Sequence, residues 1–111
     1  MDTFVIEQKE EQGSVRLGGD LTAILVPELR AGLKETLNKG ARELVFDLNR
    51  TAMLDSSGIG LLIATANSLA LSGGRIKVTN AGPDIFRLLQ SMRLTGRLNV
   101  TAKVAQESPD G

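Results

Sequence analysis

The chain has 111 residues, 41% of them hydrophobic and 23% charged, which is the composition of one globular domain with a single core. Lysine and arginine balance aspartate and glutamate, so the formal net charge is zero and nothing indicates an electrostatic grip on nucleic acid or anionic lipid. Because cysteine and histidine are absent, the sequence excludes disulfides, thiolate metal sites and a Ser-His-Asp nucleophile within this chain.

The cellular setting is also constrained by the sequence. The N-terminal stretch MDTFVIEQKEE turns acidic and polar early, unlike a signal peptide, and no apolar run is long enough to span a bilayer. Three phenylalanines are the whole aromatic content, which disfavours a base-stacking surface for RNA or single-stranded DNA. We therefore expect a cytoplasmic protein without a cofactor that contacts neither membrane nor nucleic acid.

The first predicted elements are two strands joined as a hairpin. Residues 3–11, TFVIEQKEE, alternate weakly and predict a first strand, possibly at an edge. QGS at 12–14 predicts the turn, with Gly13 supplying a positive φ angle. Residues 14–21, SVRLGGDL, alternate as the second arm.

A helix and a central strand are predicted next. Pro27 suits the first turn of this helix and Gly40 its end. The continuous apolar run at 44–48 predicts a strand covered on at least one face. The helical face is predicted to comprise Val26, Leu29, Leu33 and Leu37.

Two more helix–strand pairs complete the chain. A second helix is predicted from about Ser57 to the LSGG stretch at 71–74, with Gly73 in the left-handed conformation. Strands are predicted at 75–80 and 96–104 on either side of a third helix that opens at Pro83. The inward residues are expected to be Ile59, Leu62, Ile63, Ala66, Leu69 and Ala70 in the second helix, Ile76 and Val78 in the strand, and Ile85, Leu88, Leu89 and Met92 in the third helix.

The predicted order is therefore β-β-α-β-α-β-α-β. Strands that alternate with short helices indicate an α/β fold with parallel neighbours and right-handed crossovers. We expect a single domain over 1–111, with its core at about 4–104 and a frayed tail at 105–111.

The stretch AMLDSSGIGLL at 52–62 is the candidate functional segment. Asp55, Ser56 or Ser57 can each cap the N–H groups of a helix start, so an ordinary N-cap and turn is one interpretation. Gly58 and Gly60 interrupt the first turn, each at a cost of about 1 kcal/mol relative to alanine, which indicates that something approaches the backbone closely. A glycine-flanked hydroxyl at this place is accessible to a kinase, and the fold is expected to tolerate a phosphate there.

Three segments carry a resemblance to a known family. Residues 44–62, LVFDLNRTAMLDSSGIGLL, closely resemble the phosphorylation-site segment of STAS-domain anti-sigma-factor antagonists. Residues 14–33 resemble the second strand and first helix of that family, and residues 73–100 its fourth strand, third helix and last strand. The resemblance covers residues 4 to 104, almost the whole chain.

The resemblance implies a STAS-like mixed, mostly parallel sheet of about five strands, with an N-terminal hairpin and helices mainly on one face. It implies that Ser56 is the regulatory phosphoserine, with Ser57 as the alternative, that Ser57 caps the helix, and that Asp55 shapes the turn and kinase recognition. The implied partners are an anti-sigma factor with serine-kinase activity, which docks only on the unphosphorylated protein and so releases a sigma factor, and a serine phosphatase. The partner-binding residues would be Asp20, Thr22, Asp55, Ser56, Ser57, Gly58, Ile59 and Gly60.

One loop departs from the family pattern. Members usually carry Gly-Glu-Leu/Ile-Asp and then Thr/Ser-Ala-Pro, whereas residues 19–27 here read GDLTAILVP. Asp20 stands for the glutamate, Thr22 replaces the aspartate, and Leu25 and Val26 replace the Thr/Ser-Ala pair. This departure keeps open a second function, a STAS scaffold without phosphoregulation in a signalling assembly or a transport complex.

Other chemistry is weakly supported. GIG at 58–60 lacks the lysine of a Walker motif and the full dinucleotide fingerprint. Asp20, Asp47 and Asp55 can be read as a metal site, although scattered acids at strand ends are more often solvated or capping. A serine nucleophile at 56 or 57 has no evident activating base, so we expect neither a metal site nor an enzyme.

Overall fold

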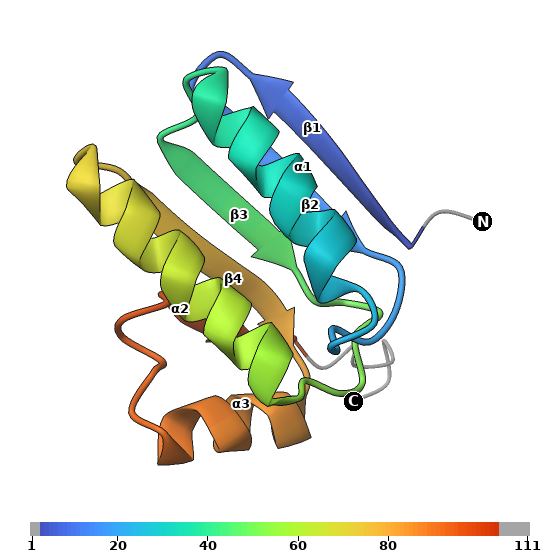
Figure 1. Ribbon diagram of the computed structural model, residues 1–111. Coiled ribbons are helices and arrows are strands. Elements are labelled where there is room, and N and C mark those ends of the chain that lie inside the picture. Colours follow the sequence, from blue (N-terminus) through green and yellow to red (C-terminus); the bar gives the residue numbers. More distant parts are fainter. Residues whose placement is uncertain (1–2, 105–111) are drawn as a thin grey trace, which may run out of the picture.

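Residues 3–104 are described by a computed structural model of the chain (Figure 1). Helices and strands follow in the order predicted from the sequence, and the tail predicted to fray, 105–111, lies outside the described residues. The elements are β1 (Phe4–Lys9), β2 (Gln12–Leu17), α1 (Val26–Asn38), β3 (Glu43–Asp47), α2 (Ser56–Leu71), β4 (Arg75–Ala81), α3 (Pro83–Ser91) and β5 (Val100–Ala102).

The five strands form one mixed sheet in the order β1-β2-β3-β4-β5. β1 pairs antiparallel with β2, and every later pair is parallel. α1 and α2 lie side by side across one face of this sheet, and α3 lies near the carboxyl end of β4 (Figure 1). The predicted α/β class, the edge position of β1 and the helices on one face are confirmed. No helix in the part of the chain that the structure describes is long and apolar enough to cross a membrane.

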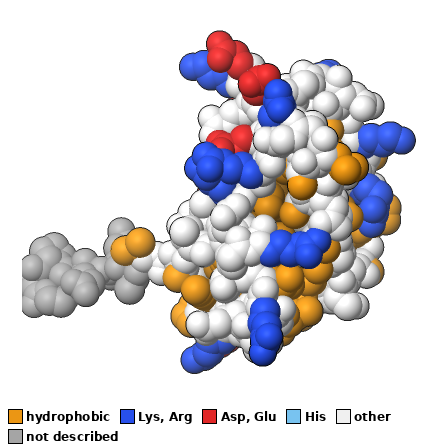
Figure 2. All heavy atoms as spheres, turned by 90° about the vertical axis from the view of Figure 1, so that its left-hand side faces the viewer, with side chains coloured by type: hydrophobic (Ala, Val, Ile, Leu, Met, Phe, Trp, Pro, Cys, Tyr) orange, Lys and Arg blue, Asp and Glu red, His pale blue; other side chains and the backbone are white. Residues whose placement is uncertain are grey.

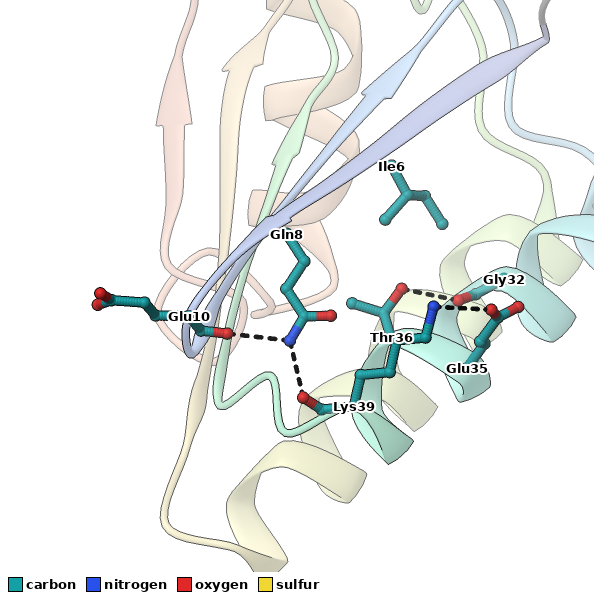
Figure 3. A pocket seen from close by; sticks show the side chains of 7 residues that line it. All are labelled: Ile6, Gln8, Glu10, Gly32, Glu35, Thr36 and Lys39. Carbon is teal, nitrogen blue, oxygen red and sulfur yellow. Dashed lines mark hydrogen bonds and ion pairs between the residues drawn. The ribbon is translucent and has the colours of Figure 1, made fainter.

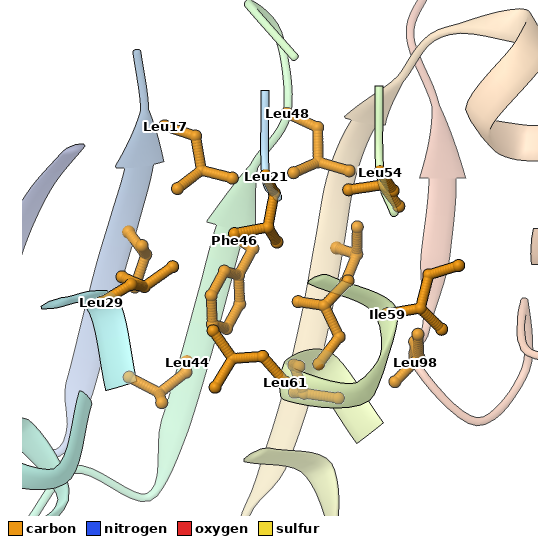
Figure 4. Packing of buried hydrophobic residues seen from close by; sticks show 14 of the residues in the cluster. Leu17, Leu21, Leu29, Leu44, Phe46, Leu48, Leu54, Ile59, Leu61 and Leu98 are labelled. Atoms are coloured by element: carbon orange, nitrogen blue, oxygen red, sulfur yellow. The ribbon is translucent and has the colours of Figure 1, made fainter. Parts of the chain in front are cut away.

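The helix-covered face of the sheet carries the core. Alternate residues of the strands are buried there, with Phe46 of β3 fully buried in the middle. Figure 4 shows Phe46 between Leu29 of α1 and Ile59 of α2, with Leu61 nearby. The opposite face is polar. Glu43 on that face binds Arg75 at 2.8 Å and Lys77 at 3.7 Å across β3 and β4.

The hairpin turn lies two residues earlier than predicted. Lys9 pairs with Gln12, so the turn consists of Glu10 and Glu11, and Glu10 carries the positive φ of 56°. Gly13 lies inside β2 and is buried, and a Cβ atom there would come within 2.4 Å of Leu44 Cδ2. The glycine is thus needed because a neighbouring side chain crosses it, and its prediction as a turn residue was wrong.

Some of the predicted inward faces also need correction. In α3, Ile85 and Leu89 are buried, but Leu88 and Met92 are 37% and 46% exposed. In α2, Ala70 is exposed, whereas Leu61, which was not predicted, is buried. α3 rests on β4 and the three-residue β5, so it buries a narrow stripe, while α2 lies over β4 and against α1 and buries a wide one.

The side of the molecule on which α2 and α3 lie has a distinct surface. Figure 2 shows hydrophobic side chains gathered in its lower half among Lys and Arg side chains, whereas Asp and Glu side chains lie toward the top. Leu88 and Met92, which were predicted to face inward, add to the exposed apolar surface of the domain.

Neighbouring leucines of α3 test the corrected burial. Leu89→Ala should lower the free energy of unfolding by about 2–5 kcal/mol, because it opens a cavity in the core, whereas Leu88→Ala should cost under about 1 kcal/mol. Urea unfolding of both variants measures the difference. Equal losses would contradict the helix orientation described above.

Candidate functional site

Loops at the carboxyl ends of β2 and β3 meet beside the start of α2. Residues 18–25 follow β2 and residues 48–55 follow β3. Leu21 and Leu54 form an isolated parallel bridge, in which the Leu21 N–H donates to the Met53 carbonyl at 3.1 Å and the Asp55 N–H donates to the Leu21 carbonyl at 3.3 Å. The two loops therefore act as a short extension of the parallel sheet.

The Asp55 carboxylate joins both loops to the helix. Oδ1 accepts the Gly58 N–H at 2.8 Å, which makes Asp55 the N-cap of α2, and Oδ2 accepts the Ala23 N–H at 2.8 Å. Hydrogen bonds from the backbone N–H groups of Gly58 and then Ala23 lower the pKa of Asp55, because they favour the ionised carboxylate. One side chain thus fixes the turn, the helix start and the neighbouring loop.

A second acid ties the same loops from the other side. Asp20 Oδ1 accepts the N–H groups of Ala52 and Met53, each at 3.0 Å. The Thr51 hydroxyl donates to the Gly19 carbonyl at 2.8 Å and is buried. The loops are therefore held together by side chains of both, which makes the surface they present rigid.

The acids that a metal site would have used serve as acceptors for protein groups. Asp47 Oδ1 accepts the Asn49 N–H and the Asn80 side-chain amide, both at 2.9 Å, while Asp20 and Asp55 are occupied as described above. Residues 3–104 contain no group of three acidic side chains arranged to hold a metal ion. The arrangement is suited to fixing loop geometry.

The structure places Ser56 as expected but does not give Ser57 the expected capping role. Ser56 is the first residue of α2 and Ser57 the second, and both are exposed. Asp55, not Ser57, caps the helix, so the expectation of a capping Ser57 was wrong. The carboxylate wins the cap position because it reaches the Gly58 N–H from outside the helix, whereas both serines already have helical backbone.

The two glycines of the turn, Gly58 and Gly60, differ in whether their surroundings require a residue without a side chain. A Cβ atom at Gly58 would lie 2.4 Å from the Leu21 carbonyl oxygen, so a close approach of the loops requires glycine there. A Cβ atom at Gly60 would meet nothing within 4 Å, and Gly60 is exposed. Contacts among residues 3–104 thus explain Gly58 but not Gly60.

The predicted partner-binding residues come together, but not all at the surface. Asp20, Ser56, Ser57 and Gly60 are exposed, and Thr22 and Asp55 are half-buried. Gly58 and Ile59 are buried, so they support the site from below.

Sequence reasoning missed two residues of this region. Ile24 is 93% exposed and Met53 is 52% exposed. Both are large apolar residues within polar loops, and this pattern could have marked them as candidate surface contacts. The Ala23 N–H, by contrast, carries no sequence signal, because any residue except proline would supply it.

A separate hollow of about 610 Å³ lies between β1 and α1 (Figure 3). Its polar groups bond mainly to one another: Gln8 Nε2 donates to the carbonyls of Glu10 and Lys39, and the Thr36 hydroxyl donates to the Gly32 carbonyl. This hollow lies at the hairpin end of β2, away from residues 18–25, and none of the predicted site residues lines it.

Acid should weaken the turn through Asp55. Its pKa is lower in the folded than in the unfolded chain, so its stabilising contribution is present at neutral pH and is lost as the pH falls through the folded-state pKa. Asp55→Asn keeps one side-chain oxygen that can accept a hydrogen bond. Its NH₂ group replaces the other oxygen and faces either the Ala23 N–H or the Gly58 N–H, so two donors meet and one hydrogen bond is lost. We expect Asp55→Asn to be less stable than the wild type at pH 7 and this gap to narrow toward pH 3, as measured by urea unfolding.

The exposed Glu11→Gln is the control for the change in net charge, because within residues 3–104 the Glu11 carboxylate forms no ion pair. A gap between wild type and Asp55→Asn that stays constant from pH 7 to pH 3 would mean that the ionised carboxylate does not stabilise the turn.

Comparison with known proteins gives this geometry a context. A family model described as "Mlab, STAS domain" matches residues 4–102. The anti-sigma-B factor antagonist of Bacillus subtilis (strain 168) is 26% identical over 98 residues, which cover 88% of this chain and 89% of that protein.

Solved structures share the fold. The anti-sigma factor antagonist SpoIIAA in its unphosphorylated form has a TM-score of 0.80 and 23% identity over 92% of this chain and 89% of that chain. The Bacillus cell fate determinant SpoIIAA in the phosphorylated form has a TM-score of 0.74 and 25% identity over 96% of each chain. By sequence and by fold, this chain belongs to the STAS domain family.

Proposed function

We propose that this chain is an anti-sigma-factor antagonist switched by phosphorylation of Ser56. The observation that carries the proposal is the exposed Ser56 hydroxyl at the first position of α2, on a turn that is fixed from both sides. Relatives over most of the chain are anti-sigma-B factor antagonists, and a protein of the same fold has been solved in phosphorylated and unphosphorylated forms. The unphosphorylated chain binds an anti-sigma factor with serine-kinase activity and thereby releases the sigma factor.

The rigid turn supports a switch that works by charge rather than by refolding. Asp55 already occupies the Gly58 N–H, the group that an anion at this helix start would otherwise bind. A phosphate on Ser56 would add about −1.5 to −2 charges beside the Asp55 carboxylate. The added charge therefore stays on the surface and must be desolvated by any protein that covers the turn, which costs several kcal/mol and weakens binding about a hundredfold or more.

The geometry gives little support to an enzyme. Ser56 and Ser57 have no histidine or cysteine partner in this chain. The nearest acid along the chain, Asp55, directs both oxygens to backbone N–H groups that lower its pKa, so it is a poor general base. A binding role needs only the exposed surface.

The switch is tested with the serine-kinase anti-sigma factors encoded in the genome that carries this chain. Each is purified and incubated with the chain and ATP, and the phosphate is mapped by mass spectrometry. We expect modification at Ser56 in the wild type and in Ser57→Ala, and none in Ser56→Ala. Calorimetry should give at least about a hundredfold weaker binding for the phosphorylated chain.

Ser56→Asp serves as a second measurement, and Ser68→Asp, on the exposed surface of the same helix, is its control. No modification at Ser56, together with an unchanged affinity of Ser56→Asp, would defeat the proposal.

The glycine pair separates a structural from a binding role. Gly58→Ala should lower the free energy of unfolding by about 1–3 kcal/mol, because its Cβ would overlap the Leu21 carbonyl. Gly60→Ala should instead raise the free energy of unfolding by up to about 1 kcal/mol. Alanine has a higher helix propensity than glycine, and its Cβ atom would displace no described atom. If the anti-sigma factor approaches the backbone here, Gly60→Ala should also weaken binding about tenfold, equivalent to about 1.4 kcal/mol.

Thermal unfolding and calorimetry measure the two effects. A Gly60→Ala variant that is stable and binds as the wild type would exclude close contact at this glycine.

An alternative function is a STAS scaffold that is not phosphorylated. The specific observation in its favour is Thr22, a neutral residue where antagonists of this family usually carry aspartate beside the phosphorylation turn. On this alternative, kinases leave Ser56 unmodified, and Ser56→Asp still binds the partner of the assembly. The phosphate mapping described above therefore distinguishes the two functions.

A further inference from the structure

A hollow beside the proposed interface has a chemistry of its own. It measures about 350 Å³ and lies between residues 18–25 and the first turn of α1. Ile24 and Leu25 supply its apolar surface, and the Ile24 side chain is 93% exposed. An aliphatic side chain held almost wholly in water is available for contact with a partner.

The charged side chains around this hollow are all acidic. They are Asp20 in the loop and Glu28 in α1. Within residues 3–104, neither carboxylate forms an ion pair. The two backbone N–H groups that bind Asp20 both go to Oδ1. The hollow thus combines an apolar surface with negative charge that no cation of the described chain balances.

This combination selects one kind of occupant. Arginine and lysine carry a long apolar stem that ends in a cation. Ile24 and Leu25 offer an apolar contact for the stem, and Glu28 and Asp20 offer a counter-charge for the head. An acidic side chain of a partner would be repelled, and a purely apolar one would leave both carboxylates without a counter-charge.

We propose that this hollow receives a basic side chain of the protein partner and so contributes to partner choice. The inference rests on the proposed function, because it names the partner chemistry at the same interface. The hydrogen bond from the Ala23 N–H to Asp55 ties the loop that carries the exposed Ile24 to the residue that precedes Ser56.

The test is the affinity of the purified anti-sigma factor for two variants. Glu28→Lys reverses the charge at the hollow and should raise Kd about tenfold or more. Ile24→Ser removes the apolar surface and should raise Kd about fivefold, in the range of a moderate interface contact. Ile24→Ser should unfold at the wild-type temperature, because its side chain is exposed. Glu28→Lys should unfold slightly below it, because Glu28 lies in the first turn of α1, where a negative charge is favourable.

Each variant has a matched control. Glu35→Lys makes the same charge change on α1, next to the other hollow, and Leu71→Ser makes a similar polar change at a side chain that is 92% exposed at the far end of α2. Both controls should bind within about twofold of the wild type, since neither residue lines the hollow. In the partner, reversing the basic residue to glutamate should restore the affinity for Glu28→Lys.

The outcomes separate the two proposals. If Glu28→Lys and Ile24→Ser bind as the wild type while Ser56→Asp does not bind, the basic-side-chain proposal is wrong and the phosphorylation switch stands. If both variants lose affinity while Ser56 stays unmodified and Ser56→Asp binds normally, the hollow is part of the interface and the switch is wrong. If Glu28→Lys loses no more affinity than Glu35→Lys, the charge of the hollow plays no part in recognition.

Discussion

The carboxylate of Asp55 is the constraint on which the site depends. Through Gly58 it fixes the first turn of α2, and through Ala23 it holds the loop that follows β2. Because the pKa of this acid is lowered by the same hydrogen bonds, the charged form is the one that holds the arrangement together. The backbone position of Ser56 therefore depends on Asp55, a residue outside α2, and on the loop that Asp55 binds.

The sheet explains why the candidate site lies at one edge. One of its faces is filled by α1 and α2, and the other is covered by polar side chains such as the Glu43–Arg75 pair. The loops at the carboxyl ends of β2 and β3 remain as a surface that is rigid and also mixed in chemistry, with an exposed hydroxyl, an exposed isoleucine and two acids. Parallel α/β sheets commonly place their ligands at this edge.

Much of the fold was predictable because its signals are local and periodic. Helical spacing and strand alternation gave the order of all eight elements, and the DSSG stretch gave the start of α2. The errors arose where distant packing decides. Gly13 is required by Leu44 of another strand, and Leu88 is exposed because the sheet beneath α3 is short. In the site, the donors to Asp20 and Asp55 are mostly backbone groups of a remote loop, which leave no trace in the pattern of side chains.

The hydrogen bonds that join residues 18–25 to residues 48–55 limit how the sequence of such a domain can change. The bridge between Leu21 and Leu54, the two carboxylates and the Thr51 hydroxyl fix the loops at several points along their length. An insertion or deletion in one loop would move its hydrogen-bonding groups out of register with those of the other loop. Neither loop can therefore change its length independently of the other. New specificities must then arise by exchanging individual outward-facing side chains, such as the 93% exposed Ile24, while the backbone of both loops stays the same.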